Sequence, residues 1–134
     1  MMQDIYSKVL AKVAFAPVAF SSDAATAGII IDTAGFESGK MVLATGVVTT
    51  GDISITKIEE GTDASLSDAS DIPAARLIGT AGTAVTTSNT VSELGFITDV
   101  KHRYVRVTVT TANSAALLAG VICELGHPDD QPIR

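Results

Sequence analysis

A short alternating segment near the end of the chain constrains its fold more than any other feature. Val105, Val107 and Val109 alternate with polar or aromatic residues across positions 104–110. Because successive side chains of a β-strand point to opposite faces, this pattern predicts a strand with one buried face. No long helical period competes with it, and the abundant Val, Ile and Thr suit a pleated, half-buried surface. We therefore predict an all-β protein.

Further β-prone segments are separated by turn signals at short spacing. Strands are predicted at residues 28–32, 40–48, 53–58, 77–78, 83–87, 91–97 and 115–125. Residues 49–52 and 88–89 are predicted to close two β-hairpins, residues 111–114 a further turn, and residues 59–76 a solvated acidic loop. A chain of 134 residues fits one domain. These features predict a single β-sandwich or jelly-roll-like domain.

The N-terminal segment differs from the rest, so we divide the chain into residues 1–20, an N-terminal arm or edge strand, and residues 21–134, the β-sandwich domain. Spacing of Ile5 and Val9 allows a short helical turn, whereas the sequence around Pro17 is extended. Arm and edge strand are both compatible with this sequence. If the segment is an arm, its apolar side chains are the candidate partner-binding residues: Ile5, Tyr6, Val9, Leu10, Val13, Phe15 and Phe20.

Charge and hydropathy exclude some classes of partner. The net charge of -6 repels phosphate backbones, so no nucleic-acid partner is expected. Lys101, Arg103 and Arg106 form one small basic cluster, for which pairing with acidic neighbours in the same sheet or across a subunit boundary is the simpler explanation. No apolar stretch is long enough to span a bilayer, and no secretory signal is recognised, so no membrane partner is expected.

Motifs for catalysis or cofactor binding are also missing from the sequence. The segment at Gly39 and Lys40 lacks the first glycine and the hydroxyl residue of a phosphate-binding loop. His102 and His127 have no Cys or His at zinc-ligand spacing, and Cys123 lies in an apolar run where a buried, unreactive thiol is expected. We predict no enzyme, no cofactor, no metal site and no small-molecule substrate.

The order of segments resembles a family of small tailed-bacteriophage virion proteins. The resemblance is carried by residues 31–38 (IDTAGFES), 74–79 (AARLIG), 102–107 (HRYVRV) and 125–128 (LGHP), and covers residues 28 to 128. None of these segments is a catalytic motif.

The resemblance implies a virion structural protein, a capsid decoration or cement subunit that binds the major capsid protein and stabilises the shell. It also implies a location on the capsid surface, after synthesis in the host cytoplasm. Edge strands and an apolar segment further predict a closed homo-oligomer, a trimer or dimer. The alternatives are a head-fibre base, a tail-associated protein or a host-surface or carbohydrate-binding module; the last is disfavoured because the chain has no Trp and few other aromatic residues.

Overall fold

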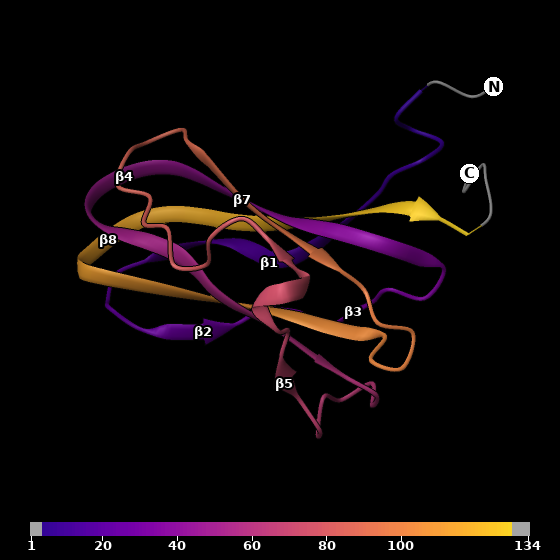
Figure 1. The fold of residues 1–134 in the computed structure, drawn as a ribbon. Helices are drawn as coiled ribbons and strands as arrows, with labels where there is room; N and C mark the ends of the chain where they lie inside the picture. The colour runs from indigo at the N-terminus through magenta and orange to yellow at the C-terminus, as the bar shows by residue number, and fades with distance from the viewer. Residues whose placement is uncertain (1–3, 130–134) are drawn as a thin grey trace.

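The computed structural model describes residues 4–129 and is all-β, as predicted (Figure 1). Its elements are β1 (Leu10–Phe20), β2 (Ala25–Ala27), β3 (Ile31–Asp32), β4 (Phe36–Gly61), β5 (Ser70–Asp71), a 3₁₀ turn (Ala74–Arg76), β6 (Leu77–Ile78), β7 (Val91–Ile97) and β8 (Tyr104–Pro128). Within the described residues no helix is long and apolar enough to cross a membrane.

Two very long strands, β4 and β8, organise the molecule. All strand pairs are antiparallel, and the order β1-β8-β4-β7-β6 is extended by β2 and β3 on β8 and by β5 on β4. Residues 36–44 of β4 pair with residues 120–128 of β8, and residues 52–61 of β4 pair with residues 104–112 of β8. Both strands bend at the same end of the molecule (Figure 1). The sheet therefore folds over itself into the two layers of a sandwich.

The bends of β4 and β8 lie at residues 49–52 and 111–114, where the sequence predicts turns. The predicted hairpin over residues 40–58 is wrong, because these residues all belong to β4, which pairs with β8. Gly51 has φ 78°, and Asn113 and Ser114 have φ 61° and 59°, so both segments contain the left-handed backbone that a turn signal implies. The chain does fold back there (Figure 1), but each part of β4 pairs with β8 instead of with the other part of β4. Asp52 lies opposite Ala112 in the ladder, so the two corners lie side by side. Each corner carries its strand from one layer into the other.

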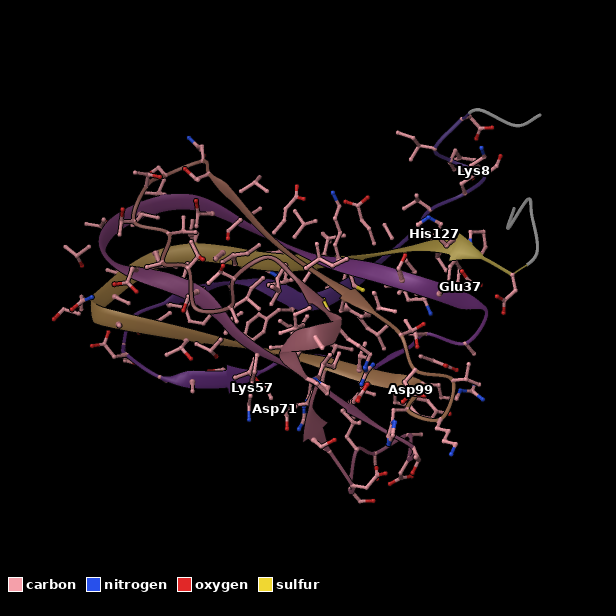
Figure 2. All side chains as sticks on the ribbon, viewed as in Figure 1. Lys8, Glu37, Lys57, Asp71, Asp99 and His127 are labelled. Atoms are coloured by element: carbon pink, nitrogen blue, oxygen red, sulfur yellow. The ribbon has the colours of Figure 1, made fainter. Side chains whose placement is uncertain are left out.

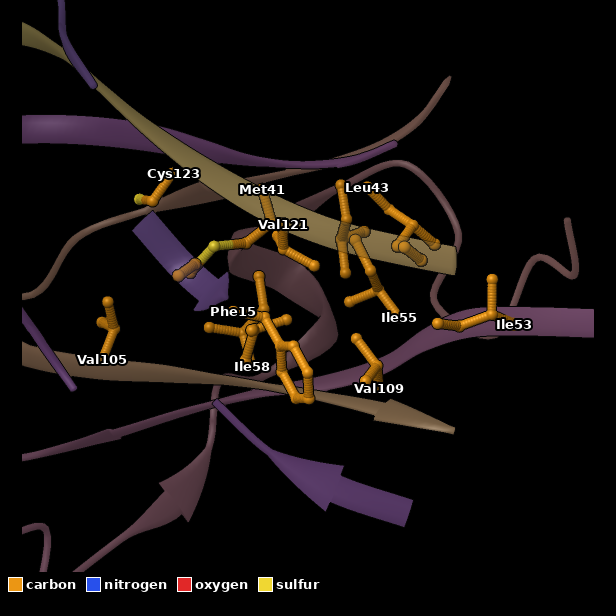
Figure 3. Packing of buried hydrophobic residues seen from close by; sticks show 14 of the residues in the cluster. Phe15, Met41, Leu43, Ile53, Ile55, Ile58, Val105, Val109, Val121 and Cys123 are labelled. Carbon is orange, nitrogen blue, oxygen red and sulfur yellow. The ribbon is translucent and has the colours of Figure 1, made fainter. Parts of the chain in front are cut away.

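The core lies between the layers. The first layer holds β1, β6, β7 and the paired residues 36–44 of β4 and 120–128 of β8. It contributes Met41, Leu43, Leu94, Phe96, Val121, Cys123 and Leu125 to the core. The second layer contributes Ile31, Ile53, Ile55, Ile58, Val105, Val107 and Val109 (Figure 3). The alternation in residues 104–110 thus predicted the buried face of β8 correctly. Cys123 is fully buried, as predicted, and loss of solvation raises the pKa of its thiol to about 12.

The predicted second hairpin is also wrong. Of the segment 83–87, only Val85 joins the sheet, through an isolated bridge to Ile53. The partners of β7 are β4 on one side and β6 on the other. The predicted strands at residues 77–78 and 91–97 are confirmed. Residues 59–76 are more ordered than a solvated loop, because β4 continues to Gly61 and β5 pairs with it.

Candidate docking face

The outward surface of the first layer carries an unusual concentration of apolar side chains. Val13 of β1, Ile122 of β8 and Val42 of β4 lie directly opposite one another in the ladder, so they share one face. Val13 is 45% and Ile122 38% exposed. We use "outer face" for the apolar residues on this surface: Val13, Val42, Ala44, Val91, Leu118 and Ile122.

The sequence of β8 explains how this face arises. Leu117, Ala119, Val121 and Cys123 are buried, while the residues between them point outward. At outward positions an antiparallel sheet normally carries polar residues, which make the surface compatible with water. Here the whole run is apolar, so the strand has one face for its own core and a second face suited to another surface.

A hollow of about 840 Å³ borders the outer face. It is lined by Lys8, Val9, Ser38, Gly39, Lys40, Ile78, Gly79, Glu93, Gly95, Glu124, Gly126, His127 and Pro128. Gly126 contributes open space to it, because no atom lies within 4 Å of the position that a Cβ there would take. A segment of another chain can approach the sheet backbone closely at such a place.

Three charged side chains around the hollow, those of Lys40, Glu93 and Glu124, are already paired with one another. Lys40 donates to Glu93 at 3.0 Å and lies 4.0 Å from Glu124. The hydrogen bond to Glu93 raises the pKa of the Lys40 ammonium, so this lysine stays charged. His127 is bonded to Ser38 at 2.7 Å and lies on the same side as Lys8 (Figure 2). These pairs form a polar rim beside the outer face.

The candidate partner-binding residues of the N-terminal segment fall into separate environments. Ile5 and Tyr6 are 74% and 67% exposed, in a turn closed by bonds from Lys8 N and Val9 N to Ile5 O. Val9 and Leu10 are half-buried, and Val9 lines the hollow. Val13 belongs to the outer face.

The other two candidates, Phe15 and Phe20, contribute to the core instead of a docking arm. Leu10–Phe20 is strand β1, paired with β8, so of the two alternatives for this segment the structure has the edge strand. Phe15 is only 9% exposed, and Phe20 packs against the core with its ring 5.7 Å from that of Phe15. The reason is a bulge after Val13, which turns both Ala14 and Phe15 inward.

Residues considered for other chemistry are mostly occupied by structural contacts. Arg103 pairs with Asp32, and Arg106 lies 3.2 Å from Glu59, so the expected pairing within the sheet is confirmed for these two of the three basic residues. Gly39 lies within strand β4, and the space beside its Cα is filled by Phe96, so it is no phosphate-binding loop.

The acidic loop shows the same local bonding. Asp63 accepts hydrogen bonds from Ser65 and Ser67, which hold the pKa of its carboxyl at about 2. Asp68 accepts from Thr62 in the same way. These carboxylates thus order their own loop.

One group of possible metal ligands was missed by the sequence analysis. Glu60, Asp99 and His102 place one carboxylate or imidazole atom each within 4.8 Å of one another. The spacing Asp-x-x-His was visible in the sequence, but Glu60 reaches the pair only through the fold. This group lies apart from the outer face, at the end of the second layer.

Comparison with known proteins gives no family. No protein-family model matches the chain, and no curated protein matches it. Among solved structures, it is similar to the SPBc2 prophage-derived protein YomS, with a TM-score of 0.49 and 12% identity over 89% of this chain and 93% of that one. It is also similar to CBM29_1, a family 29 carbohydrate-binding module from Piromyces equi, with a TM-score of 0.35 and 12% identity over 91% and 94% of the two chains.

Proposed function

We propose that the chain is a structural subunit of a tailed-bacteriophage virion, without enzymatic activity, that decorates the capsid by binding the major capsid protein. The outer face is the observation that carries the proposal, because it presents apolar side chains across β1, β8, β4 and β7 with a polar rim at one side. An apolar centre with a polar rim is the ordinary composition of a protein interface. The resemblance of the sequence to small phage virion proteins supports the same function.

The chemistry of the outer face favours a protein partner over a sugar or a nucleic acid. Its residues are aliphatic, whereas sugar-binding sandwiches stack sugars on exposed aromatic rings. The net charge of -6 opposes a phosphate backbone. Burying exposed aliphatic surface stabilises a complex by about 25 cal/mol per Å² before the costs of association. A flat protein surface is the occupant that gains most from this face.

Self-association is part of the proposal. Strand β1 is the edge of the first layer, and its Val13 and Val18 are both 45% exposed. Pro17 interrupts the hydrogen-bonding potential of this edge, which guards against open-ended strand addition. A closed trimer or dimer on the shell is therefore favoured over a filament.

The test uses charged substitutions on the outer face and a matched control elsewhere. Leu118→Glu and Val91→Glu each place a carboxylate among exposed side chains, at 46% and 56% exposure. Val100→Glu makes the same chemical change at a residue that is 95% exposed in the loop between β7 and β8. Each protein is mixed with capsid shells that lack this subunit, and the bound fraction is measured by cosedimentation.

Both outer-face variants are expected to melt like the parent protein and to bind shells at least ten-fold more weakly, about 1.4 kcal/mol or more for desolvating the new charge. Val100→Glu is expected to bind normally. Binding of all three variants at the parent affinity would overturn the proposed docking face. Counting copies separates the alternatives, since hundreds per particle indicate decoration and a few indicate a fibre base or tail.

A further inference from the structure

We propose that Glu60, Asp99 and His102 form a binding site for one divalent transition-metal ion of the zinc type. Glu60 lies next to the end of β4, and the other two residues lie in the loop between β7 and β8. Their ligand atoms all lie within 4.8 Å of one another. The site is independent of the proposed function, because none of its residues belongs to the outer face.

The loop is built so that two of the ligands are held together. His102 N donates to Asp99 O at 3.0 Å and Lys101 N donates to Asp99 Oδ1 at 3.0 Å, which closes a tight turn. Asp99 Oδ2 then lies 3.0 Å from His102 Nδ1. Zinc ligands lie about 2.1 Å from the ion, so two of them in a tetrahedron are about 3.4 Å apart. Small side-chain shifts would therefore bring all three onto one ion.

An orphaned oxygen on Glu60 is the second, independent observation. Glu60 is only 4% exposed, and its Oε2 accepts a hydrogen bond from Arg76. Its Oε1 is buried and has no hydrogen-bond partner among the described residues. Leaving a buried carboxylate oxygen without a partner costs free energy. A cation bound between Glu60, Asp99 and His102 would remove that cost.

The local charge suits a divalent cation. The two carboxylates and the Arg76 guanidinium sum to one negative charge, and an imidazole binds a metal in its neutral form. An imidazole nitrogen combined with carboxylate oxygens favours zinc-type ions, whereas calcium and magnesium prefer oxygen ligands alone.

A metal there would fasten the loop of residues 98–103 to the end of β4. Arg76 already bonds both Glu60 and the carbonyl of Ile97, the residue just before this loop, the latter at 3.0 Å. An ion that binds only the folded state raises stability by mass action. The site would thus stiffen one end of the sandwich.

The test uses the full, untagged chain after treatment with EDTA. Zn²⁺ is titrated by calorimetry, and Co²⁺ is added separately to record the absorption bands of a bound, coordinated ion. Asp99→Asn and His102→Ala remove ligands that are 36% and 34% exposed in their side chains, so both variants are expected to fold. The controls are His127→Ala, which removes the other histidine, and Glu59→Gln, which alters the carboxylate adjacent to Glu60.

One equivalent of Zn²⁺ is expected to bind, with a rise in melting temperature. Asp99→Asn and His102→Ala are expected to weaken binding at least about ten-fold, since loss of mere outer-shell partners already costs that much. The controls are expected to bind like the parent protein. The proposal is overturned by no saturable binding, which would mean that a buried water serves Glu60, by equal binding in the ligand variants, or by Ca²⁺ binding as tightly as Zn²⁺.

Discussion

Replacing Phe15 by alanine tests whether β1 is part of the folding unit. Phe15 is 9% exposed and lies among core residues (Figure 3), and the centroid of its ring is 5.7 Å from that of Phe20. Removing a buried phenylalanine ring destabilises a protein by about 3–5 kcal/mol through lost transfer free energy and the cavity that remains. Since a domain of this kind has about 5–15 kcal/mol of stability in total, the variant loses a large share of it.

The assay is urea unfolding followed by far-ultraviolet circular dichroism, which reports on the whole sheet. Val13→Ala is the matched control, because Val13 lies in the same strand but is 45% exposed on the outer face. The loss of unfolding free energy in Val13→Ala is expected to stay below about 1 kcal/mol, the contribution of roughly one buried methylene group. Both variants should keep the parent slope of free energy against urea, which shows that the same surface is exposed on unfolding.

If Phe15→Ala lowers the free energy of unfolding by less than about 1 kcal/mol, this reasoning is refuted, because removing a fully packed ring destabilises a protein by more than that. Residues 1–20 would then act as a detachable arm. A truncation offers an independent check. Deleting residues 1–9 leaves β1 intact and is expected to leave a folded protein, while deleting residues 1–20 uncovers β8 and the core beneath it and is expected to unfold or aggregate it.

Two further predictions concern a corner and an ion pair. A Cβ added by Gly51→Ala would lie 2.5 Å from the carbonyl oxygen of Ala112, at φ 78°, whereas one added by Gly35→Ala, at φ 88°, would meet no atom within 4 Å. In thermal melts, Gly35→Ala is expected to lower the free energy of unfolding by about 1 kcal/mol through backbone strain alone, and Gly51→Ala by clearly more because of the added clash. The hydrogen bond from Arg103 is the main cause that lowers the pKa of Asp32 in the folded state. The pairing therefore stabilises the fold fully above the unfolded-state pKa of about 3.9, and this stabilisation is lost as the pH falls through the lower folded-state pKa. Asp32→Asn should therefore flatten the decline of stability at acid pH; an unchanged decline would contradict it.

The sequence predicts the class of fold well and its topology poorly, and the reason is physical. Alternation in residues 104–110 depends only on local geometry, so the buried face of β8 could be predicted from it. Turn signals at Gly51 and Asn113 are also local, and both residues adopt the left-handed backbone expected of them. Whether such a residue closes a hairpin or carries a strand into a second layer depends on pairing with distant residues. That information is absent from any short window.

The candidate sites were hidden for related reasons. Leu118 and Ile122 belong to an apolar run that reads as entirely buried, and periodicity cannot show that one side of such a run faces water. The ligand group is hidden differently. Asp99 and His102 are close in sequence, but they become a possible metal site only where the second layer brings Glu60 beside them.

Strand β1 resolves the alternatives of arm and edge strand, because it serves both sides of its layer. Phe15 points into the core, while Val13, two residues earlier, points to the outer face, and the bulge between them makes this possible. If the outer face docks on a shell as proposed, substitutions in this one strand must separate into two kinds. Val13→Glu should weaken shell binding at unchanged stability, whereas Phe15→Ala should weaken binding only to the extent that it unfolds the protein, and should bind normally at low temperature where the folded fraction is restored. If both variants lose binding equally under conditions in which they are folded, Phe15 lies at the interface. That result would contradict the burial of Phe15, on which the assignment of β1 to the core depends.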